Sequence, residues 1–105
     1  MKPWKSYHEG LMKDLKDPDE AAEYLNAVLE EGDYRMFLVA LRHVAEANGG
    51  LLNLSKKTKL SRPNLYRMLS KKGKPEIYSL YKILETFGLT LSVFPKKQSN
   101  LKKAA

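Results

Sequence analysis

The chain has 105 residues, enough for one domain, and its composition of 43% hydrophobic and 30% charged residues is that of an ordinary globular protein. It contains no cysteine, which excludes disulfides and thiolate metal sites, and no apolar run approaches the roughly 20 residues of a membrane span. We therefore expect a cytoplasmic protein that does not associate with membranes. The net charge is +7, yet residues 1–49 carry six basic and ten acidic side chains, whereas residues 50–105 carry 13 basic and two acidic ones. This asymmetry indicates a polyanionic partner for the second half, and a solvated basic face is the alternative.

The first half is predicted to be a helical hairpin with acidic outer faces. Residues 1–16 are polar and irregular, and we expect them to form an N-terminal arm. Asp17, followed by a proline, is a good N-cap for a first helix that Gly32 ends. Asp33 caps a second helix, in which residues 37–45 hold an apolar stripe at helical spacing.

Two short helices follow. Residues 51–59 combine leucines with lysines and predict a helix with one apolar and one basic face. Ser61 is a strong N-cap for the next helix, in which the spacing of Leu65, Met68 and Leu69 predicts that these three side chains point inward.

A fifth helix is predicted after a basic loop at residues 72–75, and Gly88 is its stop signal. Its side chains expected to point inward are Ile77, Leu80, Ile83, Leu84 and Phe87.

The chain after Gly88 is predicted to form a short strand, because the aliphatic residues Leu89, Leu91 and Val93 alternate with Thr90, Ser92 and Phe94. An unpaired strand in a helical chain suggests pairing with the same strand of a second copy across a two-fold axis. The alternative is an extended arm that covers the core. Residues 96–105 are expected to be a basic disordered tail. The predicted fold is all-α, with five helices and a C-terminal β-strand, in a single domain of residues 17–95.

Two short helices joined by a tight turn form a helix-turn-helix, which we predict at residues 52–71. The second helix of this motif enters the major groove of DNA, where Arg67 suits guanine and Asn64 suits adenine. Lysines around the motif are placed to neutralise phosphates. The candidate DNA-binding residues are Lys56, Lys57, Ser61, Arg62, Asn64, Tyr66, Arg67, Ser70, Lys71 and Lys72.

The stretch LSKKTKLSRPNLYRML, residues 54–69, resembles the helix-turn-helix of Cro and phage repressors. Lys59 departs from that pattern, since glycine is usual in the left-handed turn. With DPDEAAEYLNAVLEEGD before it and LYKILETFGLTLSVFP after it, residues 17–94 resemble the antidote proteins of bacterial chromosomal addiction modules. The resemblance implies that the protein is the antitoxin of a type II toxin-antitoxin module. Such a protein neutralises a small ribonuclease toxin and represses its own operon as a homodimer on a palindromic DNA operator.

The acidic first half suits a basic ribonuclease toxin, and the expected toxin-binding residues are Glu20, Glu23, Glu30 and Glu31. A phage-like transcriptional repressor without a toxin partner is the main alternative. A third class is a protein-interaction module or an RNA-associated adaptor, although side chains cannot read the deep, narrow major groove of A-form RNA. We expect no enzyme, cofactor or metal site, because His8 and His43 lack ligand spacing and no nucleophile elbow or phosphate-binding glycine loop is present.

Overall fold

The computed structural model describes residues 3–96, with side chains from residue 7 onward. Six helices are formed in this part of the chain: α1 (Pro3–Asp14), α2 (Pro18–Glu30), α3 (Tyr34–Ala47), α4 (Gly50–Thr58), α5 (Arg62–Met68) and α6 (Ile77–Thr86). The prediction of an all-α fold is confirmed. Within residues 3–96 there is no strand, so the prediction of five helices with a C-terminal strand is wrong. None of the six helices combines the length and apolar character that a membrane span requires.

Three helices begin at the side-chain caps that the sequence predicts. The carboxylate of Asp17 accepts a hydrogen bond from the backbone N–H of Asp19 at 2.9 Å, and Asp33 accepts one from Arg35 at 3.0 Å. The hydroxyl of Ser61 accepts the N–H of Asn64 at 3.2 Å. Each cap satisfies one of the backbone donors that a helix leaves without an internal partner.

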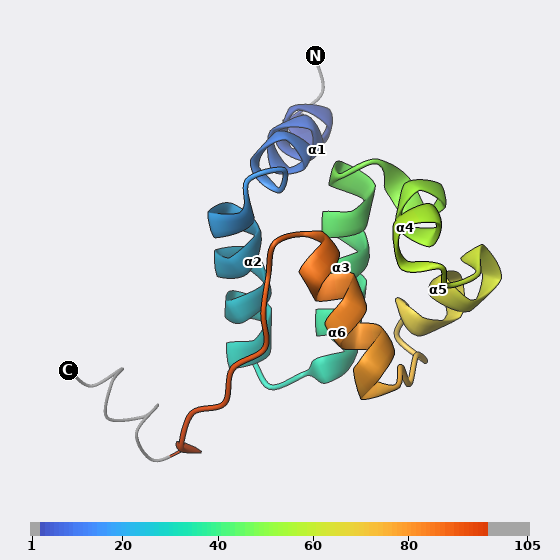
Figure 1. Ribbon diagram of the computed structural model, residues 1–105. Coiled ribbons are helices and arrows are strands. Elements are labelled where there is room, and N and C mark those ends of the chain that lie inside the picture. The colour runs from blue at the N-terminus through green and yellow to red at the C-terminus, as the bar shows by residue number, and fades with distance from the viewer. Residues whose placement is uncertain (1–2, 97–105) are drawn as a thin grey trace.

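The core is built around α3. The α3 side chains Leu41, Val44 and Ala45 are completely buried, and Leu15, Leu54, Leu65, Leu69 and Ile83 are also almost or fully excluded from solvent. Full burial of one such aliphatic side chain contributes roughly 1.5–3 kcal/mol, so this cluster dominates the stability of the domain. Figure 1 shows α2 on one flank and α4 and α5 on the other, with α3 and α6 between them.

The additional helix is α1, which covers most of the predicted N-terminal arm. It packs on α3, with Leu11 and Met12 half-buried against the core. The side-chain amide of Asn48 donates to the carbonyls of Leu15 at 3.1 Å and of Val44 at 2.8 Å, which ties the chain between α1 and α2 to the end of α3. The sequence does not indicate α1 because its apolar side chains are too few to set a helical period.

The prediction of which α6 side chains point inward is partly wrong. Ile83 and Leu84 are buried, and Leu80 and Phe87 pack half-buried against the core. Ile77, by contrast, is 69% exposed, because it is the first residue of α6 and lies at the end of the helix farthest from that cluster.

Residues 89–95 run in an extended course after Gly88, which ends α6 at a φ of 76° as predicted. The N–H of Leu89 donates to the carbonyl of Leu84 at 2.9 Å and Leu89 packs against the core, whereas Val93 is 93% exposed. No second strand lies beside this segment in the described part, so no ladder forms within the chain. Pairing with a second copy stays a prediction. The predicted basic tail lies outside the described residues, apart from Lys96.

Candidate nucleic-acid interface

Helices α4 and α5 are joined by a turn of three residues, Lys59, Leu60 and Ser61. Lys59 has φ 67° and ψ 16°, and among the described residues it is the one non-glycine residue with a positive φ. Its N–H donates to the carbonyl of Ser55 at 2.9 Å. The left-handed turn expected at Lys59 from the sequence is therefore confirmed.

Two hydroxyl groups of α4 hold this turn in place. Ser55 Oγ donates to the carbonyl of Leu60 at 2.5 Å. Thr58 Oγ1, in a side chain only 2% exposed, donates to the carbonyl of Leu54 at 2.8 Å and accepts the N–H of Leu60 at 3.2 Å. These contacts fix α5 relative to α4. The sequence interpretation missed them, and the signal for them is a serine and a threonine in the last turn of a helix.

Helix α5 has one buried and one exposed face. Leu65 and Leu69 are fully buried and Met68 is 7% exposed, which agrees with their spacing. The helix ends at Met68, so Ser70 and Lys71 lie beyond it in a turn rather than on its outer face. Of the sequence-predicted DNA contacts, Asn64 and Ser70 are half-buried, and the exposed ones are Lys56, Lys57, Ser61, Arg62, Tyr66, Arg67, Lys71 and Lys72.

The two predicted base-reading side chains touch each other. Arg67 Nη2 donates to Asn64 Oδ1 at 3.2 Å on the exposed side of α5. Ser70 Oγ donates to the carbonyl of Arg67 at 2.9 Å, so the serine hydroxyl caps the end of the helix. Arg67 and Asn64 are thus presented as a pair, with further guanidinium donors of Arg67 left for a ligand.

Tyr66 is supported by a residue that the sequence interpretation missed. The guanidinium carbon of Arg42, on α3, lies 5.0 Å from the centre of the Tyr66 ring, a cation–π distance. Arg42 also pairs with Glu46 at 3.7 Å. No local pattern could identify this contact, because Arg42 and Tyr66 belong to different helices and meet only after folding.

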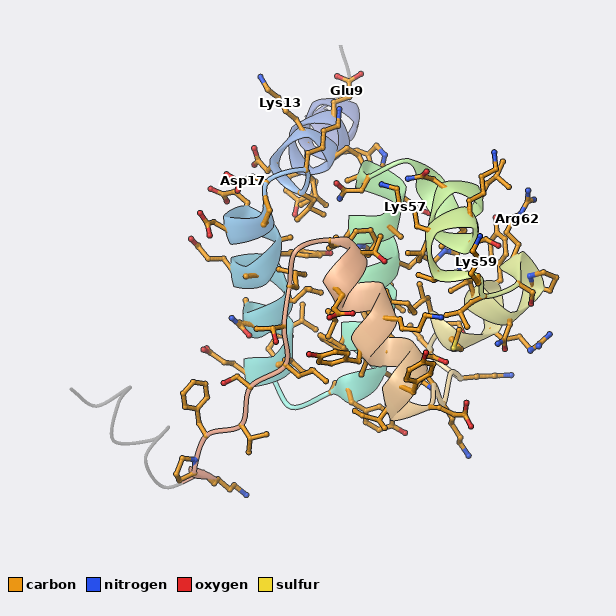
Figure 2. All side chains as sticks on the ribbon, viewed as in Figure 1. Glu9, Lys13, Asp17, Lys57, Lys59 and Arg62 are labelled. Carbon is orange, nitrogen blue, oxygen red and sulfur yellow. The ribbon has the colours of Figure 1, made fainter. Side chains whose placement is uncertain are left out.

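Positive charge gathers on this side of the molecule. Figure 2 shows Lys57, Lys59 and Arg62 on α4, the turn and α5, away from Asp17 at the start of α2. The ion pairs within the described residues are Arg35–Asp33 and Arg42–Glu46, and neither uses a lysine of this surface. The basic side chains of α4, α5 and the following loop are thus not neutralised by neighbouring carboxylates.

The acidic residues predicted to bind a toxin lie elsewhere. Glu20, Glu23, Glu30 and Glu31 are all exposed on or at the end of α2, on the flank opposite α5 (Figure 1). The predicted dimer residues Leu89 and Leu91 line a groove with α2, whereas Val93 does not. The structure therefore separates two candidate surfaces, one basic and one acidic.

The histidines form no joint site. His43 Nδ1 shares a hydrogen bond of 2.8 Å with the Tyr24 hydroxyl, at the half-buried edge between α3 and α2. Burial raises the pKa of Tyr24, and repulsion from Tyr7 adds to this effect. His8 lies exposed on α1. His43 is thus a packing residue with a hydrogen-bond partner.

Comparison with known proteins identifies a relative and a family of this chain. It is 29% identical over 79 residues to an uncharacterised protein of Haemophilus influenzae, an alignment that covers 75% of this chain and 80% of the relative. No solved structure matches the chain significantly. The family described as "Probable addiction module antidote protein" matches residues 8–95, which include all helices from α2 to α6 and most of α1. The chain therefore belongs to the family of probable addiction module antidote proteins.

Proposed function

We propose that this protein is the antitoxin of a type II toxin-antitoxin module that binds its own operator DNA through α4 and α5, as a Cro/repressor-type helix-turn-helix. The observation that carries the DNA-binding part is the exposed α5 face, with its Asn64–Arg67 pair, beside a cluster of basic residues without carboxylate partners. A major groove admits one helix, and arginine and asparagine are the side chains that suit guanine and adenine.

The geometry of the pair supports a division of roles on DNA. Arg67 and Asn64 would contact base edges, while Lys56, Lys57 and Lys72 would neutralise phosphates on either side of the groove. One helix of this length reaches only a few base pairs, so we propose that a homodimer binds a palindromic operator and represses the module's own operon.

Membership of the antidote family implies a toxin partner. We propose a small basic ribonuclease, because RNA-binding proteins need positive charge and the exposed carboxylates Glu20, Glu23, Glu30 and Glu31 complement it. In this arrangement toxin and DNA occupy opposite flanks of the same domain.

The test of DNA binding is a fluorescence-anisotropy titration with the DNA upstream of the protein's own gene. Arg67→Ala should weaken binding by about 1–3 kcal/mol and relax the base preference at one position of each half-site. Changing Lys56 and Lys57 together to Ala should lower the slope of log affinity against log salt by roughly one to two units, with no change in base preference. Lys13→Ala, on α1, is the matched control for loss of one exposed positive charge and should leave the affinity unchanged. An equal loss for Arg67→Ala on every operator variant would show that Arg67 contacts phosphate and not a base.

A further inference from the structure

A groove of about 870 Å³ lies along α2 on the flank opposite α5. Figure 1 shows the chain after α6 descending beside α2, and this segment forms one wall. The apolar lining includes Leu25 and Leu29 of α2, Phe37 of α3, Leu84 of α6, and Leu89 and Leu91 of the segment. Leu29 is 47% exposed and Leu91 is 40% exposed, so both offer apolar surface to a partner.

One edge of the groove is acidic. Between Pro18 and Glu31 the chain has five carboxylates and no basic residue. Asp19, Glu23, Asn26 and Glu30 are spaced i, i+4, i+7 and i+11, so they share one stripe of the helix. Asn26 and Glu30 line the groove, so Asp19 and Glu23, on the same stripe, lie on the groove side of α2. Lys96 lines the groove as well and is the one basic residue of its described lining.

The other two carboxylates between Pro18 and Glu31 lie off this stripe. Glu20 and Glu31 fall roughly a quarter turn further round the helix than the groove stripe, at about 100° per residue. Within the described residues none of these five carboxylates, four in α2 and Glu31 directly after it, forms an ion pair.

Residues 90–93 of the segment beside the groove differ from Leu89 in their backbone hydrogen bonds. Leu89 is the last residue of the segment that is held by a backbone bond to α6. Residues 90–93 make no backbone hydrogen bond within the described part of the chain. Their N–H and C=O groups can therefore bond to a polypeptide that lies in the groove.

We propose that this groove is the anchor site for the toxin of the module, which inserts apolar side chains between α2 and residues 89–92 and sets basic residues against the Asp19–Glu23–Glu30 edge. This inference rests on the proposed function, and it adds the residues and the mode of contact. Burial of apolar side chains supplies affinity, while the acidic edge attracts the partner over a distance and raises the association rate. A second copy placed across a two-fold axis through the groove fits less well, because it would bring two acidic α2 edges together.

The apolar part is tested with the protein encoded by the adjacent reading frame of the module, by surface plasmon resonance. Leu29→Asn and Leu91→Ser each remove a partly exposed apolar side chain that lines the groove. Each should raise the dissociation constant about tenfold or more, mainly through faster dissociation. Val93→Ser is the matched control, because Val93 lies in the same segment, is 93% exposed and does not line the groove. It should leave the dissociation constant unchanged.

The acidic edge is tested by charge reversal on α2. Changing Glu23 and Glu30 together to Lys should slow association about threefold or more at low salt, an effect that salt screens. Changing Glu20 and Glu31 together to Lys alters the net charge equally on the neighbouring stripe and should slow association less. Equal effects of the two double variants would show that only net charge matters and would overturn the assigned edge.

Operator binding, measured in parallel, distinguishes failure of the groove assignment from failure of the proposed function. All groove variants should bind operator DNA as wild type does. If the wild-type protein binds the toxin and both Leu29→Asn and Leu91→Ser bind it as tightly, the groove assignment is overturned and the proposed function stands. If the wild-type protein does not bind the toxin, both are overturned. Should Leu29→Asn fail to fold by circular dichroism, Leu91→Ser decides, since Leu91 lies outside the helices. If Leu91→Ser instead splits a dimer in sedimentation, the groove joins two copies and the proposal is wrong.

Discussion

Substitutions at Lys59 measure the backbone strain in the turn between α4 and α5 through their effect on the stability of the protein. A residue with a Cβ atom in the left-handed region costs roughly 1–2 kcal/mol relative to the right-handed one. Lys59 occupies this region at φ 67°, and its side chain is exposed. Replacement by glycine removes that cost but returns about 0.5–1 kcal/mol, because glycine gains more freedom in the unfolded chain. We therefore expect Lys59→Gly to stabilise the protein by about 0.5–1 kcal/mol.

Lys59→Ala is the variant that isolates the strain. It removes the same charge but keeps a Cβ atom at a positive φ, so its stability should stay near that of wild type. Thermal unfolding followed by circular dichroism should place the midpoint of Lys59→Gly about 2–6 °C above that of Lys59→Ala. Equal midpoints for the two variants would refute the idea that the turn stores strain at this residue.

The same two variants test whether Lys59 contributes to operator binding through its charge. If Lys59 contacts one phosphate, both should lower the slope of log affinity against log salt by about 0.9. The stability of the two variants should differ while their salt slopes agree. A smaller slope change for Lys59→Gly than for Lys59→Ala would contradict a role limited to charge.

Three further predictions follow from individual contacts. Gly73→Ala would place a Cβ atom 2.0 Å from the carbonyl oxygen of Met68. We therefore expect chemical denaturation to show a free energy of unfolding lower by about 2–3 kcal/mol. Gly10→Ala is the control, because its Cβ would have nothing within 4 Å, and it should be neutral or stabilising. Arg42→Ala removes the cation over the Tyr66 ring and should weaken operator binding by about 0.5–1 kcal/mol at constant fold stability; an effect no larger than that of the Lys13→Ala control would refute this role. Desolvation raises the pKa of Asp33, but hydrogen bonds from the Arg35 side chain and backbone outweigh it and hold that pKa below its usual value. This cap therefore stabilises the fold at neutral pH and is lost as the pH falls below the usual aspartate range, so the unfolding midpoints of wild type and Asp33→Ala should converge in acid and differ near pH 7.

The features predicted correctly from the sequence are those encoded over a few consecutive residues. The caps at Asp17, Asp33 and Ser61 depend on hydrogen bonds that span two or three residues, and the left-handed turn at Lys59 belongs to a short local pattern. Such contacts form wherever the local sequence allows them, so sequence alone indicates them.

The features that were missed depend on segments that meet only in the folded chain. The predicted helix-turn-helix runs to residue 71 and includes Ser70, but α5 ends at Met68, where Gly73 folds back against its last carbonyls. The alternation at residues 89–93 predicted a strand, yet a strand needs a neighbour for its backbone groups, and none is present in the described part. The contact of Arg42 with Tyr66 and the groove beside α2 likewise follow from the packing of helices. The assignment of the DNA-contacting residues stays a prediction.

The central position of α3 has a consequence for how such a module diversifies. The acidic helix α2 packs against one part of α3, and α4, which carries α5, packs against another. Substitutions at well-separated sites without shared partners have additive effects, so changes on one flank leave the other flank's binding intact. If the proposed toxin and operator surfaces are those of this chain, then after a gene duplication one copy can drift toward a different toxin while it retains its promoter, or acquire a new promoter while it retains its toxin. Crosstalk between sister modules in one genome is then removed on one flank at a time, and no intermediate needs to lose both activities.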